Sequence, residues 1–398
     1  MPERPRASAA AGLPASLMRG GARKALFLPG RELPSRSAER DALIARLLGC
    51  PDPVGLQLDG VGGGSADTSR VVVVTPSLRD ECDIDAQFGT VDPRTGRIDW
   101  TAGDSDLVAA AGLFALLEGL HPCAEGVTRV RIWHAGARAQ VDAMVPVRDG
   151  QVLQGGVFTE DGVPFAGVEI RLEFLDPTDG GRGGPLLPSG QALEPLAVPG
   201  LGSVALTLLG GGWPAVLVRA DRLGLTGRET LAQLERDRRL RGRCQAVLAA
   251  AASRFAETGS VGAQSLLFAS VDPAAAGGGE PPLIWVAPPA PYRASGGAAV
   301  EAAEIDLLAR AWVDGRVQPG LSLSAAVAVA IAAALPGSVV NGAARTLPGV
   351  PTRIGAPGGP LAVGADLQAT GAQWRLEKVA LSHGARRLMS GRVFGALG

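Results

Sequence analysis

The chain has 398 residues with 38 basic and 39 acidic side chains, so its formal net charge is −1. This balance, without a basic run, argues against a non-specific nucleic-acid binder, and 46% hydrophobic with 19% charged residues argues against disorder. The length predicts two domains of ordinary size, each able to bury its own core. Only two of the basic side chains are lysines, Lys24 and Lys378, so lysine-based chemistry has few candidates.

The cysteines and the apolar runs bear on compartment and on metal binding. Cys50, Cys82, Cys123 and Cys244 form no CxxC pair, which favours free thiols in a reducing compartment over a zinc site or a disulfide framework. The N-terminal segment lacks the apolar core of a secretory signal, and the apolar run 321–335 is too short to cross a bilayer. We therefore expect a cytoplasmic protein that binds no membrane and no metal.

In the first half of the chain, short apolar segments alternate with two helical patterns. Residues 1–12 are expected to form a disordered extension, and residues 60–65 form a tight glycine loop. The predicted strands are 24–28, 68–74, 128–133, 140–147 and 167–174. One predicted helix runs through Leu48, with Ser37 or Asp41 as its N-cap, and a second runs over 107–120, with Asp104 or Ser105 as its N-cap.

The second half repeats this mixture after a linker rich in glycine and proline at 176–199. The predicted strands are 202–209, 214–219, 266–271 and 284–288, followed by short strands in the last 45 residues. The predicted helices are 232–256, with Thr230 as its cap, 304–312 and 325–335. The pattern is that of an α+β protein with two similar lobes. No GxGxxG or GxxxxGK[ST] motif predicts a nucleotide site.

Eight segments, in order along the chain, carry a resemblance to a known family. They are 13–21 (LPASLMRGG), 57–64 (QLDGVGGG), 68–71 (TSRV), 82–88 (CDIDAQF), 187–190 (LPSG), 220–227 (ADRLGLTG), 335–340 (LPGSVV) and 382–393 (SHGARRLMSGRV). The chain resembles the PrpF family, whose members include 2-methylaconitate cis-trans isomerase, methylitaconate isomerase and 4-oxalomesaconate tautomerase.

The resemblance implies a diaminopimelate-epimerase-like fold, in which each of two lobes wraps a sheet around a central helix and the active site lies in the cleft between the lobes. It implies an N-terminal lobe at 13–185, a C-terminal lobe at 186–380, and a segment 381–398 that returns to the first lobe.

The family chemistry moves a double bond in a small polycarboxylate, which requires a base, an acid and donors that stabilise the enolate-like charge. The resemblance places Arg70 where the family has a lysine and Asp104 where it has a cysteine, so these two are the catalytic candidates. Arginine stays protonated, so Arg70 holds a carboxylate or stabilises an enolate, unless it is only a solvated or salt-bridged residue. Asp104 is either a base or only a helix N-cap.

The glycine-rich and hydroxyl-bearing segments are expected to bind the carboxylates of the substrate. Glycine lets backbone N–H groups converge on an anion, although the same pattern forms ordinary tight turns. The candidate substrate-binding residues are Arg19, Gly20, Lys24, Gly63, Gly64, Ser69, Gly103, Ser105, Ser189 and Gly190. The three histidines, His121, His134 and His383, are scattered and are interpreted as structural or exposed.

These observations favour a cofactor-independent isomerase or tautomerase with altered acid/base residues. Its partner would be a small unsaturated mono- or polycarboxylic acid, or an ester or thioester of one, with no nucleic acid; a homodimer is left open. Two alternatives remain: a non-catalytic protein that binds small acids on the same fold, and a diverged cyclase or lyase of specialised metabolism.

Overall fold

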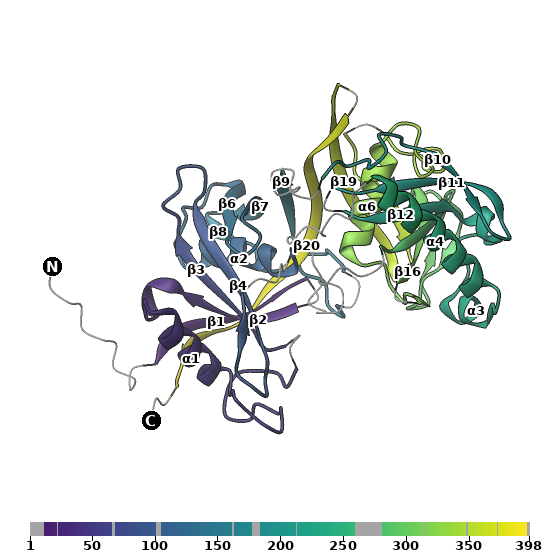
Figure 1. Cartoon of the computed structure of the whole chain (residues 1–398). Helices are drawn as coiled ribbons and strands as arrows, with labels where there is room; N and C mark the ends of the chain where they lie inside the picture. Colours follow the sequence, from purple (N-terminus) through teal and green to yellow (C-terminus); the bar gives the residue numbers. More distant parts are fainter. Residues whose placement is uncertain are drawn as a thin grey trace. The chain divides into compact units, whose positions relative to one another are not determined.

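The computed structural model describes residues 12–21, 23–65, 68–100, 105–160, 163–176, 184–211, 213–258, 281–313, 315–347, 349–371 and 373–395 (Figure 1). The chain forms two compact units: Met1–Leu172 with Ser382–Gly398, called unit 1, and Glu173–Leu381, called unit 2. Strands β9 (Val168–Leu175) and β20 (Gln373–Val393) contribute residues to both units. No helix in the described part of the chain is both long and apolar enough to cross a bilayer.

Unit 1 is a sheet wrapped around one buried helix. Its strands are β1 (Leu13–Gly20), β2 (Arg23–Pro29), β3 (Arg70–Pro76), β4 (Ile84–Val91), β5 (Ile98–Asp99), β6 (Gly126–His134), β7 (Ala139–Arg148) and β8 (Gln151–Val152). Its helices are η2 (Gly30–Glu32), α1 (Ser37–Leu47) and α2 (Ser105–Leu117). Residues 107–111 and 113–116 of α2 are all apolar and at most 5% exposed. A helix that is apolar all round is stable only inside a core, and β1–β4 and β6–β8 surround α2.

Unit 2 has the same design around a different helix. Its strands are β10 (Glu194–Val198), β11 (Gly202–Leu209), β12 (Ala215–Arg219), β13 (Leu283–Ala287), β14 (Tyr292–Arg293), β15 (Ala299–Val300), β16 (Leu307–Val313), β17 (Arg316–Val317), β18 (Thr352–Ala356) and β19 (Gly359–Thr370). Its helices are η4 (Ala220–Leu223), α3 (Leu231–Arg236), α4 (Leu240–Thr258) and α6 (Leu323–Ala334). The alanine-rich α6 is the central helix, with nine buried residues, and the Ser322 hydroxyl caps its N-terminus.

The two units share one order of elements. In unit 1 the successive pairs β1–β2, β2–β3, β3–β4, β4–β6 and β6–β7 alternate between antiparallel and parallel. In unit 2 the pairs β11–β12, β12–β13, β13–β16, β16–β18 and β18–β19 alternate in the same way. In each unit a short strand, β5 or β17, pairs with the preceding strand, and the central helix follows it. The prediction of two similar α+β lobes is therefore confirmed.

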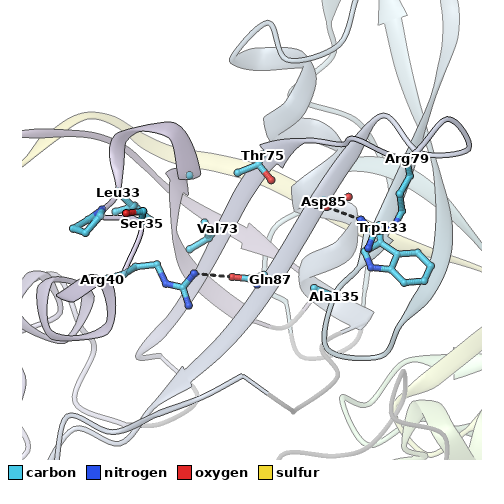
Figure 2. A pocket seen from close by; sticks show the side chains of 12 residues that line it. Leu33, Ser35, Arg40, Val73, Thr75, Arg79, Asp85, Gln87, Trp133 and Ala135 are labelled. Atoms are coloured by element: carbon cyan, nitrogen blue, oxygen red, sulfur yellow. Dashed lines mark hydrogen bonds and ion pairs between the residues drawn. The ribbon is translucent and has the colours of Figure 1, made fainter. Parts of the chain in front are cut away.

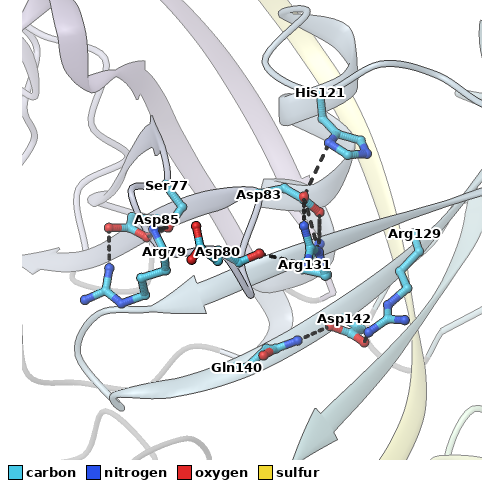
Figure 3. A network of polar contacts seen from close by, with 10 residues as sticks. All are labelled: Ser77, Arg79, Asp80, Asp83, Asp85, His121, Arg129, Arg131, Gln140 and Asp142. Carbon is cyan, nitrogen blue, oxygen red and sulfur yellow. Dashed lines mark hydrogen bonds and ion pairs between the residues drawn. The ribbon is translucent and has the colours of Figure 1, made fainter.

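An ion pair between a largely buried aspartate and a partly exposed arginine recurs at the same place in both units. Asp83 precedes β4, and its Oδ1 lies 2.6 Å from Arg131 Nη2 in the parallel neighbour β6 (Figure 3). Asp306 precedes β16, and its Oδ1 lies 2.6 Å from Arg353 Nη2 in the parallel neighbour β18. Each aspartate also accepts the backbone N–H of its arginine at 2.8 Å. The bidentate pair thus fixes the register of the parallel strands in both units.

Several predicted elements differ from the structure. The predicted helix 304–312 is strand β16, because all its residues from Leu307 to Trp312 are buried between β13 and β18, which removes the alternation that marks a half-buried strand. The predicted helix 232–256 is two helices, because Asp237 ends α3 and its side chain accepts the N–H groups of Arg239 and Leu240 at the start of α4. The expected Thr230 cap is confirmed. The expected cap of α1 is wrong, because Arg36 holds the N-cap position without a side-chain hydrogen bond and Ser37 is already the first helical residue.

The last residues form long strands where short strands were predicted. β19 has 12 residues, and β20 has 21 residues and pairs with both β19 and β1. The predicted strand 266–271 and residues 1–11 of the predicted extension lie outside the described residues.

Candidate functional site

The residues predicted for the site fall in both units. Ten belong to unit 1: Arg19, Gly20, Lys24, Gly63, Gly64, Ser69, Arg70, Gly103, Asp104 and Ser105. Ser189 and Gly190 belong to unit 2. Gly103 and Asp104 lie outside the described residues, and Ser105 is described only as the first residue of α2.

Arg70 is buried rather than solvated. It begins β3, is 2% exposed, and stands opposite Thr90 of β4, whose hydroxyl accepts a hydrogen bond from Arg70 Nη1 at 3.2 Å. A guanidinium keeps its charge in such surroundings. Arg70 is therefore a fixed cation inside unit 1, which excludes the solvated arginine considered above.

Gln57 organises the glycine loop that follows it. Its side-chain oxygen accepts hydrogen bonds from the Ser69 hydroxyl at 2.5 Å and from the N–H of Gly64 at 2.7 Å. Its amide nitrogen donates to Cys50 Sγ at 3.1 Å. The Ser69 hydroxyl and the Gly64 N–H, which were predicted to bind an anion, therefore already have Gln57 as their acceptor. Gln57 itself is 2% exposed.

Lys24 presents an available cation beside this loop. A Cβ atom on Gly63 would stand 3.4 Å from Lys24 Nζ, so the ammonium lies against the loop. Lys24 is half-buried in β2, directly opposite Arg19 of β1. Its side chain makes no hydrogen bond or ion pair with the residues that the structure describes. Among the predicted binding residues, Lys24 is the one best placed to attract a carboxylate.

Gly20 and Gly21 allow β1 to cross the first turn of α2 at very short range. A Cβ atom on Gly20 would stand 2.4 Å from the carbonyl oxygen of Asp106 and 3.0 Å from Ala110 Cβ. Gly21 has φ +54°, and a Cβ atom there would stand 2.6 Å from Asp106 Cγ. Because these two positions are glycines, β1 can approach α2 closely enough to place Arg19 near the N-terminal end of the helix.

Four charged or titratable side chains meet at this end of α2, and three of them are not among the residues predicted for the site. Arg19, Asp106, Glu160 and His383 form this group, called the His383 cluster. His383 Nδ1 lies 2.5 Å from Glu160 Oε1, and His383 Nε2 lies 3.6 Å from Asp106 Oδ1. Arg19 Nη1 lies 3.6 Å from Glu160 Oε2, which also accepts the N–H of Gly384 at 3.0 Å.

The His383 cluster is largely shielded from water. The side chains are 10% exposed for His383, 16% for both Glu160 and Arg19, and 22% for Asp106. Burial lowers the pKa of the Arg19 guanidinium, and Glu160 partly offsets that effect. Buried ionisable groups are costly unless paired, and they concentrate at functional sites. His383 lies in segment 382–393 that carried the resemblance, but nothing in the sequence links it to Asp106 or Glu160.

The other two histidines have different surroundings. His134 is fully buried, stacks on Phe88 with ring centroids 4.4 Å apart, and accepts the N–H of Ala137 at Nδ1. Burial lowers the pKa of His134 to about 4, so it is neutral at physiological pH. His121 lies near the surface with its Nδ1 3.7 Å from Asp83. The structural interpretation therefore suits His134, whereas His383 is neither exposed nor a core residue among apolar groups.

A separate hollow of about 440 Å³ lies over β3, β4 and β6 beside α1 (Figure 2). Its charged side chains are already paired: Arg40 Nη1 donates to Gln87 at 3.3 Å, and Arg79 Nη1 lies 2.7 Å from Asp85. The Arg79 guanidinium also stacks over Trp133. None of the predicted site residues lines this hollow.

Ser189 and Gly190 form a turn in unit 2. The Ser189 hydroxyl donates to Glu194 at 2.5 Å, and Glu194 in turn pairs with Arg254 at 2.6 Å. Gly190 has φ +77° and donates its N–H to the carbonyl of Leu187. The geometry matches the tight turn considered as the alternative for these two residues.

Comparison with known proteins agrees with this architecture. The family model described as "PrpF protein" matches residues 11–395. The chain belongs to the PrpF family. Among PrpF relatives, the 2-methyl-aconitate isomerase of Shewanella oneidensis is 36% identical over 389 residues, covering 95% of this chain and 96% of the relative. The 2-methyl-aconitate isomerase of Cupriavidus necator is also 36% identical, with 96% of each chain covered.

A solved structure confirms the fold over nearly the whole chain. The crystal structure of methylitaconate-delta-isomerase superposes with a TM-score of 0.81 at 26% identity, covering 96% of this chain and 95% of that chain. The two-lobed α+β fold expected from the PrpF resemblance is therefore confirmed. In the described part of the chain no group of three or more His, Cys, Asp or Glu side chains could hold a metal ion.

Proposed function

We propose that the chain is a PrpF-type isomerase that moves a double bond in a small unsaturated carboxylic acid without a cofactor. The similarity to two 2-methyl-aconitate isomerases over 95% or more of the chain carries this proposal. It favours an unsaturated polycarboxylate as substrate, with 2-methylaconitate and methylitaconate as the first acids to test.

In the proposed step, a base removes a proton from the carbon next to the double bond. The electron pair of the broken C–H bond delocalises through the double bond onto the conjugated carboxylate, and a proton then adds to the carbon one allylic position away. Atoms and charge balance without an oxidant or reductant. The step requires cations that stabilise the dienolate as it forms.

Three described cations suit that requirement. Lys24 has no competing ion pair in the described structure and would hold a carboxylate. Arg19 stands directly opposite Lys24 on β1, although its guanidinium already forms an ion pair with Glu160. The buried Arg70 would stabilise the dienolate, since it cannot accept a proton.

We propose Asp104 as the base. It lies outside the described residues but immediately precedes α2 in sequence. A carboxylate is a weak base for carbon, so this assignment favours substrates whose C–H bond is acidified by a ketone, a thioester or several carboxyl groups.

Proton NMR in D2O tests the proposal. The wild-type protein should exchange substrate C–H for deuterium and accumulate the double-bond isomer. Asp104→Asn should slow exchange by at least about a hundredfold, whereas the matched change His121→Asn, at the surface beside Asp83, should leave it unchanged. Undiminished exchange in Asp104→Asn would mean that Asp104 is only a helix cap. A rise in Tm with these acids but no exchange would instead favour a non-catalytic binding protein.

A further inference from the structure

We infer that His383, oriented by Glu160, is the general acid that returns the proton to the allylic carbon. This inference rests on the proposed function and assigns the second half of the reaction, which Asp104 alone does not supply.

The chain offers few groups that give up a proton near neutral pH. Arginine does not, and a histidine side chain does so most readily. All three histidines are described. His134 is enclosed in the core, and His121 follows the C-terminal end of α2, with its Nδ1 3.7 Å from Asp83. Only His383 stands at the first turn of α2, beside Asp106.

The contacts of Glu160 fix which nitrogen of His383 exchanges protons. Glu160 Oε1 lies 2.5 Å from Nδ1, so a carboxylate there accepts the Nδ1–H and leaves Nε2 as the nitrogen directed at α2. The other oxygen of Glu160 is held by the N–H of Gly384 and by Arg19. With both oxygens occupied, Glu160 is a positioning residue that sets the tautomer and the orientation of the imidazole.

Carboxylates lie beside both ring nitrogens of His383. Two carboxylates, Glu160 on the loop after β8 and Asp106 on α2, lie within 4 Å of its ring nitrogens. Among the cations, Arg19 of β1 pairs with Glu160, and Arg386 of β20 lies near enough to Arg19 to lower the pKa of its guanidinium further. Carboxylates at this range stabilise the imidazolium.

The complete step is balanced. Asp104 takes the proton as the first C–H bond breaks, and the electron pair moves into the conjugated system. The Nε2–H of the His383 imidazolium then breaks as the new C–H bond forms at the allylic carbon. Exchange with water removes the proton from Asp104 and returns one to His383. In D2O the receiving carbon therefore gains deuterium from the solvent in every turnover.

His383→Asn provides the decisive test, because asparagine can still donate to Glu160 in place of Nδ1 but has no group in place of Nε2. In D2O, this variant should lose isomerisation by at least about a hundredfold while still exchanging deuterium into unreacted substrate. His121→Asn should retain both activities. Isomerisation within about threefold of wild type would overturn the assignment, and so would equal loss of isomerisation and exchange in a folded protein.

Glu160→Gln tests the positioning role separately, with the imidazole retained. Removing one carboxylate should move the midpoint of the pH profile for isomerisation to lower pH, because the imidazolium loses a counter-charge. An unshifted profile with a uniformly reduced rate would indicate a merely structural role. If the wild-type protein neither exchanges nor isomerises any acid, the proposed function itself fails. That result differs from a loss of isomerisation seen only in His383→Asn.

Discussion

Replacing His134 should remove a defined part of the acid sensitivity of the fold. The imidazole is fully buried against Phe88, and burial lowers its pKa from 6.5 to about 4. Below pH 6.5 the unfolded chain binds a proton at this residue while the folded chain does not. The stability contributed by the neutral form is therefore complete above pH 6.5 and is lost progressively as the pH falls toward 4.

The size of this effect follows from the difference in pKa. One pKa unit corresponds to about 1.4 kcal/mol, so the full shift is worth about 3 kcal/mol. Between pH 7 and pH 5, the linkage relation gives a loss of about 2 kcal/mol in the free energy of unfolding from His134 alone. Other groups also titrate in this range, so the difference between wild type and variant is the quantity to measure.

Urea unfolding at pH 7 and pH 5, followed by tryptophan fluorescence, measures that difference. His134→Asn keeps an acceptor for the N–H of Ala137, and His134→Phe keeps the ring next to Phe88. Both variants should lose about 2 kcal/mol less than wild type between the two pH values, whatever their stability at pH 7. If either variant showed the same pH dependence as wild type, the attribution of the shift to burial of His134 would be refuted.

Two further predictions concern glycine packing and thiol reactivity. Gly20→Ala should destabilise the fold by about 1–3 kcal/mol, because its Cβ would collide with the first turn of α2. The control Gly242→Ala lies in an exposed stretch of α4 with no atom near its Cβ, so it should be neutral or stabilising. Urea titrations of both variants measure the difference. A thiol reagent at pH 8 should label the exposed Cys123 long before Cys82 and Cys244. Burial raises the pKa of the Cys82 thiol to about 11 and that of the Cys244 thiol to about 12. Equal labelling rates would contradict the burial of these two thiols.

The central helices and the overall fold could be predicted from the sequence. The apolar runs that form α2 and α6 contain no proline and are apolar on every side, which indicates a helix enclosed by other structure. The ordered segments of the PrpF resemblance supplied the fold, which the periodicity alone would not have done. Strand β16 was mistaken for a helix because burial on both faces hides the alternation of a strand.

The site was less predictable because its contacts join distant parts of the chain. The position of Arg70 followed from the resemblance, but its burial did not. The role of Gln57, which occupies the donors of Ser69 and Gly64, has no sequence pattern. His383 and Glu160 are far apart in sequence and come together as β20 pairs with β1 and β9, and no local signal marks that contact.

Proton NMR of the wild-type protein in D2O with 2-methylaconitate and methylitaconate tests the central claim most directly. Solvent deuterium should enter the carbon that receives the proton while the double-bond isomer accumulates. Binding of these acids, seen as a rise in Tm, with no deuterium uptake and no isomer at high protein concentration would contradict it.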